Sequence, residues 1–198
     1  MNDISVYYTE ERALAEEVEW ILRRPHAKII DWLTPRLDGM NNAVEFGCGS
    51  GIIAAALPPT LTYLGIDSNE HFLAMARKRC QARSFSQYDV RDFDPECSRP
   101  FDVAMAWNFF KHFSLAEWNA VVCCVLAHGR YGAFNAQVTA HELDNGTDYH
   151  HVHVSETRLA EAIRHAGHRE VERTVLNEWT LQSGTARDVA VWTEKINA

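Results

Sequence analysis

A glycine-rich segment and three acidic residues stand at intervals that suit the binding of a nucleoside. The segment is Gly47-Cys48-Gly49-Ser50-Gly51. Glu45 precedes it, Asp67 lies 20 residues after Gly47, and Asp89 follows in Gln87-Tyr88-Asp89-Val90. One carboxylate can accept two hydrogen bonds from a ribose diol, and another can accept one from an exocyclic adenine amine. For any one of these acids alone, a helix N-cap or a solvated loop position is the competing interpretation.

The glycine loop departs from two common phosphate-binding patterns. A dinucleotide fingerprint needs glycine at its sixth position, where this chain has Ile52. A P-loop needs a lysine directly after its glycines, and none follows here. The negative charge of Glu45 would repel a pyrophosphate and attract a cation. The loop and the three acids together therefore predict a site for an adenosine that carries a positive charge.

Alternating helix and strand patterns surround these residues. Helical spacing, caps and prolines predict a helix that starts at Thr9 and further helices over residues 27–33, 52–57, 69–82, 115–127 and 155–166. Short apolar runs predict strands over residues 43–46, 61–66, 85–90, 101–107, 131–138, 171–179 and 186–196. Ser68 or Asn69 is expected to cap the helix after the second strand. Such alternation predicts a parallel sheet with helices on both faces, and the last two strands suit an antiparallel hairpin at its edge.

Length and charge narrow the possible classes of protein. The chain has 198 residues and no visible repeat or Gly/Ser-rich linker, so a single domain over residues 1–198 is expected. Its 19 Lys and Arg residues against 27 Asp and Glu residues give a net charge of −8. Binding to a nucleic acid relies on basic residues that neutralise phosphates, and no basic stripe is present. We therefore expect no nucleic-acid partner.

The apolar runs and the cysteines indicate in which cellular compartment the protein is expected. No apolar run reaches the roughly 18 residues of a transmembrane helix, and the first residues lack a signal-peptide pattern. The five cysteines form no disulfide framework or zinc-binding spacing. These features predict a cytoplasmic protein with reduced thiols and no membrane association. The oligomeric state stays open.

Four segments of the chain contain the glycine loop, the three acidic residues and the turn after the fourth predicted strand. They are VEFGCGSG, YLGIDSNE, QYDVRDF and FDVAMAWNFFKHFS, over residues 44–51, 63–70, 87–93 and 101–114. Together they resemble the class I S-adenosylmethionine-dependent methyltransferases, in particular their small-molecule branch. The resemblance extends over residues 43–196. It implies an α/β fold, a Rossmann-like three-layer sandwich whose seven-stranded sheet is mostly parallel and ends in an antiparallel hairpin.

The resemblance also implies S-adenosyl-L-methionine as cofactor and a set of residues that bind it. Glu45 and the loop backbone would hold the methionine part, Asp67 the ribose, and Asp89 with Val90 the adenine. Trp107 and Asn108 would line the other side of the cofactor. The implied cofactor-binding residues are Glu45, Gly47, Cys48, Gly49, Gly51, Asp67, Ser68, Asp89, Val90, Trp107 and Asn108.

His112 is the candidate catalytic residue. It matches a histidine that is frequent in the family, whereas Lys111 replaces the family's usual glutamate. The implied reaction is direct displacement of the sulfonium methyl by a substrate nucleophile, and a general base helps when that nucleophile arrives protonated. The competing interpretation is a structural histidine that caps the turn after the fourth strand.

Two segments are expected to lie near the substrate. Residues 1–42 would form an N-terminal helical cap or lid, and residues 139–154 an insertion that contains His141, Asp148, His150, His151 and His153. A contact between one of these histidines and the substrate is favoured over a metal site, because no helical His-x3-His pair or cysteine ligand accompanies them. We therefore predict no metal.

These inferences predict a methyltransferase that modifies an oxygen or nitrogen atom of a small molecule. Two other functions remain open: methyl transfer to a macromolecule (tRNA or protein), and non-catalytic binding of S-adenosylmethionine in a protein that acts through a partner.

Overall fold

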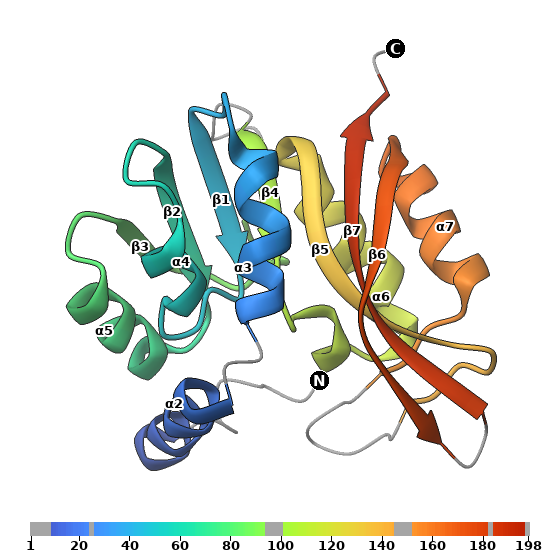
Figure 1. Cartoon of the computed structure of the whole chain (residues 1–198), viewed down its shortest axis with the longest axis horizontal. Coiled ribbons are helices and arrows are strands. Elements are labelled where there is room, and N and C mark those ends of the chain that lie inside the picture. The colour runs from blue at the N-terminus through green and yellow to red at the C-terminus, as the bar shows by residue number, and fades with distance from the viewer. Residues whose placement is uncertain (1–8, 24–25, 94–100, 145–151, 182–183, 197–198) are drawn as a thin grey trace.

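The fold is built on one seven-stranded sheet (Figure 1). The computed structural model describes residues 9–23, 26–93, 101–144, 152–181 and 184–196. The strand order is β3-β2-β1-β4-β5-β7-β6, and only the pairs β5–β7 and β6–β7 are antiparallel. The strands are β1 (Asn42–Phe46), β2 (Thr62–Asp67), β3 (Ser84–Gln87), β4 (Phe101–Ala106), β5 (Gly129–Thr139), β6 (His168–Leu181) and β7 (Gly184–Lys195).

Helices cover both faces of the sheet (Figure 1). The α-helices are α2 (Glu10–Arg23), α3 (Ala27–Leu33), α4 (Ile52–Ala56), α5 (Glu70–Arg79), α6 (Leu115–Ala127) and α7 (Glu156–His165). Two 3-10 helices, η1 (Thr34–Leu37) and η3 (Phe110–His112), follow α3 and β4. The predicted three-layer arrangement with its antiparallel terminal hairpin is confirmed.

The burial of β1 shows why the chain forms a central strand here. Both of its faces are covered, so an almost continuous apolar run is required rather than an alternating one. Val44 and Phe46 belong to the core cluster that includes α6 and α7. Ala43 belongs to the cluster on the opposite face, with α3 and α4. Glu45 interrupts this run and is itself buried.

The third strand is shorter than predicted and ends at Gln87. After it, the side chain of Asp89 accepts from the backbone N–H of Arg91 at 2.9 Å, and the backbone carbonyl of Asp89 accepts from Asp92 N at 3.0 Å. This local turn takes the chain out of the sheet, because short side chains such as Asp compete with strand hydrogen bonds. The sequence allowed either Ser68 or Asn69 to cap the helix after the second strand. The structure has Asn69 as the cap, and its Oδ1 accepts from His71 N and Phe72 N.

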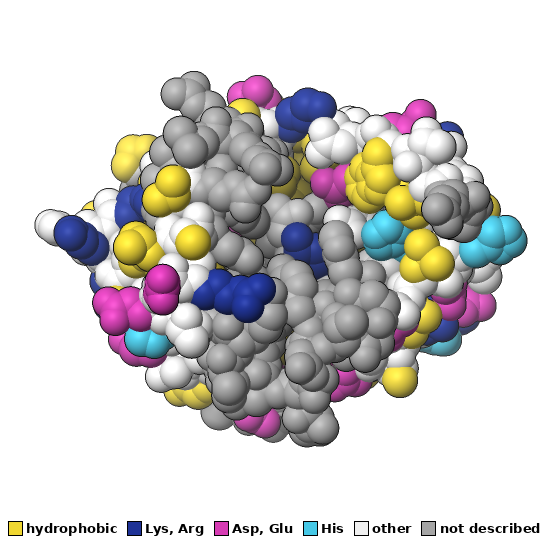
Figure 2. Space-filling model, turned by 90° about the horizontal axis from the view of Figure 1, so that it is seen from below, with side chains coloured by type: hydrophobic (Ala, Val, Ile, Leu, Met, Phe, Trp, Pro, Cys, Tyr) yellow, Lys and Arg dark blue, Asp and Glu magenta, His cyan; other side chains and the backbone are white. Residues whose placement is uncertain are grey.

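The carboxyl ends of β1, β2 and β4 meet at one edge of the sheet, at the bottom of Figure 1. Helix α2 lies below this edge, next to α5. Viewed from that side, the molecule has a central hollow that contains a Lys or Arg side chain (Figure 2). Among the helices of the described ranges, none has the length and apolar character needed to cross a bilayer.

Candidate active site

The glycine loop leaves β1 and turns over the end of β2. Gly47, Gly49 and Gly51 have positive φ angles of 69°, 51° and 76°, a region that favours glycine. A Cβ atom on Gly47 would lie 2.3 Å from the Phe109 ring. A Cβ atom on Gly49 would meet no atom of the described residues within 4 Å. The loop is thus closely packed at its first glycine and open at Gly49, where a ligand can approach the backbone.

Asp67 is tied to this loop and to the start of α5. Its Oδ2 accepts from Gly49 N at 2.9 Å, and its Oδ1 accepts from Asn69 N at 2.9 Å. Burial raises the pKa of Asp67, while hydrogen bonds from the backbone N–H groups of Asn69, Gly49 and Ser68 lower it. Each carboxylate oxygen can accept more than one hydrogen bond. The half-buried carboxylate therefore keeps acceptor capacity for two hydroxyl groups of a diol.

Glu45 lies beneath the loop with 2 % of its surface exposed. Tyr63 on the neighbouring strand donates from its hydroxyl to Glu45 Oε2 at 2.5 Å. Burial raises the pKa of Glu45 to about 8, with the hydrogen bond from Tyr63 lowering it and the charge of Asp67 raising it further. A cation placed nearby would favour the ionised form of this carboxyl and lower its pKa.

Cys48 can offer a ligand only its backbone. Its side chain is buried, and its sulfur lies 2.8 Å from the position that a Cβ on Gly65 would take. Burial and the nearby charges of Asp67 and Glu45 raise the pKa of the thiol well above its usual value. The thiol is therefore a packing group, made possible by the missing side chain of Gly65.

Asp89 is held by an arginine that sequence reasoning missed. Arg91 donates from Nε to Asp89 Oδ1 at 2.8 Å and forms an ion pair with Oδ2. The hydrogen bond from Arg91 lowers the pKa of Asp89 more than partial burial raises it. The Asp-x-Arg spacing in the sequence is the signal from which this ion pair could have been predicted. Val90, between them, is buried in the core cluster with α6.

Trp107 and Asn108 follow β4 at the same edge. Trp107 is 3 % exposed and packs edge-on against Trp32 of α3, with ring centroids 6.0 Å apart. Its Nε1 is buried without an acceptor among the described residues, which is unusual for an indole N–H and indicates a missing partner. Asn108 has a φ angle of 54°, and its backbone N–H donates to Asn135 Oδ1 at 2.6 Å.

Comparison with known proteins shows which family this part of the chain is similar to. Residues 43–132 match a family model described as a methyltransferase domain. Over these residues the chain is similar to a methyltransferase domain, and solved structures of S-adenosylmethionine-dependent methyltransferases share its fold. Among curated protein sequences, none matches this chain.

Solved structures share the fold of this chain at low sequence identity. A methyltransferase from Clostridium acetobutylicum is 9% identical, with a TM-score of 0.73 over 93% of this chain and 98% of that one. A 1,6-didemethyltoxoflavin-N1-methyltransferase from Burkholderia thailandensis is 15% identical, with a TM-score of 0.70 over 94% and 85%. Magnesium protoporphyrin IX methyltransferase from Synechocystis, with bound S-adenosylmethionine, is 14% identical, with a TM-score of 0.68 over 88% and 82%.

The residues of the edge fit such a cosubstrate on three counts. The open position over Gly49 adjoins the carboxylate of Asp67, which suits a ribose. The buried carboxyl of Glu45 suits a positively charged ligand. The buried Trp107 N–H lies at the end of β4 in need of an acceptor.

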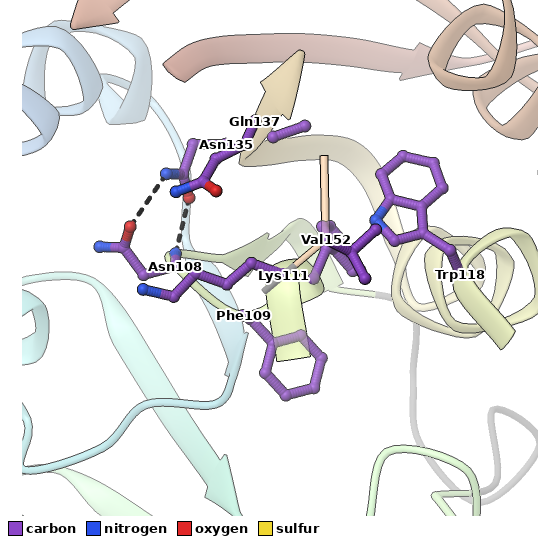
Figure 3. A pocket seen from close by; sticks show the side chains of 9 residues that line it. Asn108, Phe109, Lys111, Trp118, Asn135, Gln137 and Val152 are labelled. Atoms are coloured by element: carbon purple, nitrogen blue, oxygen red, sulfur yellow. Dashed lines mark hydrogen bonds between the residues drawn. The ribbon is translucent and has the colours of Figure 1, made fainter. Parts of the chain in front are cut away.

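A small pocket lies beside Asn108 (Figure 3). It lies between η3, α6 and β5 and has room for little more than a water molecule. One side is polar and the other apolar; the lining residues are Asn108, Phe109, Phe110, Lys111, Trp118, Asn135, Ala136, Gln137 and Val152. His112 follows Lys111 directly as the last residue of η3 and is half-buried. Its own side chain is not among the lining groups.

The histidine-rich segment is described only in part. Asp148, His150 and His151 lie outside the described residues. His141 is exposed. His153 is buried and packs edge-on against Trp179 with ring centroids 5.9 Å apart, and burial lowers its pKa. Within the described ranges, no group of three or more His, Cys, Asp or Glu side chains could hold a metal ion.

Proposed function

We propose that this methyltransferase transfers the methyl group of S-adenosylmethionine to an oxygen or nitrogen atom of a small molecule. The observation that carries the proposal is the set of groups at the carboxyl ends of β1 and β2. There the open backbone of Gly49 adjoins the carboxylate of Asp67, and the carboxyl of Glu45 is buried close to them in the chain. These groups fit a positively charged adenosine, the cosubstrate from which the methyl group would come.

The comparisons support a small substrate without naming one. The structures from Burkholderia and Synechocystis are those of a 1,6-didemethyltoxoflavin-N1-methyltransferase and a magnesium protoporphyrin IX methyltransferase, and this chain covers 85% and 82% of them. The net charge of −8 is unfavourable for a polyanionic substrate such as tRNA. Macromolecular methylation therefore stands as the outcome that would contradict the proposal.

Binding and orientation are the main tasks of the chain's own residues in this mechanism. S-adenosylmethionine supplies an activated sulfonium methyl. Asp67 would accept from the ribose, Glu45 would lie near the positive charge, and Asp89 and Val90 would contact the adenine. Aligning two reactants and excluding water contributes roughly 7–11 kcal/mol in well-oriented systems. His112 would accept a proton from the substrate or orient it.

Two segments would shape the substrate site around this edge. The helical segment over residues 1–42 would act as a cap, in keeping with the place of α2 below the sheet edge (Figure 1). The segment over residues 139–154 returns to the sheet through Val154 N, which donates to Gln137 O at 2.8 Å. Val152 N also donates to Lys111 O at 2.9 Å. This segment is thus joined to both the pocket wall and the turn that carries His112.

A labelling experiment tests the proposal. Purified protein is incubated with S-adenosylmethionine that carries a labelled methyl group, in parallel with a low-molecular-mass metabolite extract, total RNA and total protein. We expect label in the metabolite fraction alone, and none with the Asp67→Ala variant. Label in RNA or in protein would contradict the small-molecule assignment while leaving the family membership intact.

A further inference from the structure

A chain of buried polar side chains links the end of β4 to the terminal hairpin. Asn135 of β5 and Asp188 of β7 are 4 % and 8 % exposed. Asn135 Nδ2 donates to Asp188 Oδ1 at 2.7 Å and to Asn108 Oδ1 at 3.2 Å. Asn135 Oδ1 accepts from the backbone N–H of Asn108 at 2.6 Å, so two hydrogen bonds join these asparagines (Figure 3).

The chemistry of these contacts determines which way each amide faces. A carboxylate only accepts hydrogen bonds, and a backbone N–H only donates. Asn135 must therefore turn its nitrogen to Asp188 and its oxygen to the Asn108 backbone. Its second amide hydrogen then faces Asn108 and requires the oxygen of that side chain. Asn108 is left with its own nitrogen, Nδ2, pointing away from Asn135, as Figure 3 shows.

Asp188 is held in place from β6 and α3. A bulge between Val175 and Asn177 brings Asn177 opposite Asp188, and bulges commonly redirect a side chain. Lys28 of α3 donates to Asn177 Oδ1 at 3.0 Å and to Leu176 O at 2.8 Å. Burial raises the pKa of Asp188, while hydrogen bonds from Asn135 and Asn177 and the charges of Lys111 and Lys28 oppose that rise.

Asn108 is also fixed on its other side. Its φ angle of 54° makes it the one non-glycine residue with positive φ in the described ranges. The next residue, Phe109, packs against the backbone of Gly47. The outward Asn108 amide therefore lies at the junction of β4 with the glycine loop, where the methionine part of the cosubstrate is expected.

We propose that Asp188 and Asn135 are positioning residues that orient Asn108 so that its Nδ2 donates to the carboxylate of the bound cosubstrate. The inference rests on the proposed cosubstrate site. If Asn135 offered only acceptors to Asn108, the Asn108 amide would turn over and present its oxygen to that carboxylate. Two acceptors facing one another repel, so binding would weaken.

Exchanging the side chains of Asn135 and Asp188 separates an effect on the orientation of Asn108 from an effect on the stability of the protein. Asn135→Asp places two carboxyl groups in contact, so the unfolding temperature should fall together with the affinity for S-adenosylhomocysteine. The double variant Asn135→Asp with Asp188→Asn restores a donor–acceptor pair between the two strands and conserves net charge. It still offers Asn108 only acceptors. Asn119→Asp is the matched control, because it makes the same change on α6, where the side chain accepts from Arg158 Nη1 at 3.4 Å and has no contact with Asn108, Asn135 or Asp188.

Titration calorimetry with S-adenosylhomocysteine and thermal unfolding are measured on each full-length variant. We expect the double variant to recover the unfolding temperature of the wild type and to bind about tenfold more weakly, the effect of one lost hydrogen bond to a charged group. Asn119→Asp should bind within about twofold of the wild type. Asn108→Gly keeps the backbone conformation, removes the donor and should bind as weakly as the double variant.

Wild-type affinity in the double variant or in Asn108→Gly would overturn the proposal, since a purely structural network would be repaired by the exchange. An unaltered protein that fails to bind S-adenosylhomocysteine would overturn the cosubstrate site itself, and this inference with it. A protein that binds it but labels RNA would contradict the small-molecule substrate and leave the orientation of Asn108 untouched.

Discussion

The backbone N–H of Gly49 donates to Asp67 Oδ2 at 2.9 Å, which joins the loop after β1 to the end of β2. The contact holds an open stretch of backbone beside an acceptor for hydroxyl groups. Because the loop follows β1 directly and Asp67 ends the adjacent parallel strand β2, the sheet brings the two groups together. The proposed nucleoside site would therefore be formed before any ligand binds, which would limit the ordering cost of binding.

Asp67→Ala should weaken the binding of S-adenosylhomocysteine roughly 100-fold, since two hydrogen bonds to a charged acceptor contribute about 1.5 kcal/mol each. Asp102→Ala is the matched control. Asp102 also accepts from two backbone N–H groups, those of Asn41 and Asn42, but it stands at the start of β4, at the opposite edge of the sheet. Both variants should lose stability. Equal affinities for the two variants in titration calorimetry would remove Asp67 from the site.

Gly49→Ala tests whether the open face of the loop receives the ligand. Gly49 and Gly39 both have positive φ and both have room for a Cβ, so alanine at either position should cost about 1–2 kcal/mol of folding free energy. Only at Gly49 would the new methyl enter the ligand space, which should weaken binding about tenfold. The measurement is calorimetric titration of both variants with S-adenosylhomocysteine. Wild-type affinity in Gly49→Ala would place the ligand elsewhere.

The glycine loop, Asp67 and the strand alternation could be predicted because they depend on residues close together in the chain. Turn glycines, short apolar runs and capping residues act locally. The end of β3 was missed because the Asp89 turn competes with strand pairing.

Contacts across the sheet could not be predicted in the same way. Asn135 and Asp188 lie 53 positions apart, and their contact depends on the register of β7 against β5. The position of Asn177 opposite Asp188 further depends on a bulge in β6. A one-residue shift in register would turn Asp188 to the other face. Apolar alternation indicates which face a side chain takes, but it does not determine which residues of two long strands lie opposite one another.

His112→Ala tests the proposed base. If His112 accepts a proton from the substrate, kcat should fall about 100-fold or more, while the affinity for S-adenosylhomocysteine stays unchanged. His165→Ala is the control, because this exposed histidine ends α7, far along the chain from η3. The assay uses the acceptor found by the labelling experiment. Full activity in His112→Ala would mean that His112 has only a structural role in the turn after β4.

Glu45→Gln addresses the link between pH and stability. The pKa of Glu45 is raised in the folded protein to about 8 from 4.5. The folded state therefore holds its proton more tightly than the unfolded chain does. This contribution to stability is complete below pH 4.5 and is lost as the pH rises toward 8. Without ligand, we expect the wild type to lose up to about 5 kcal/mol of unfolding free energy from this group over that range. Glu45→Gln can still accept a hydrogen bond from Tyr63 but cannot titrate, so it should not show this loss of unfolding free energy.

The same titration should appear in ligand binding. A cation near Glu45 favours its charged form, so binding of S-adenosylmethionine should release a proton from this group and tighten as the pH rises toward 9. S-adenosylhomocysteine, which lacks the sulfonium charge, is the internal control, and the ratio of the two affinities removes the titration of groups common to both. We expect this ratio to rise with pH in the wild type and to stay level in Glu45→Gln. An identical rise in both proteins would mean that a different group responds to the sulfonium, because Gln cannot titrate.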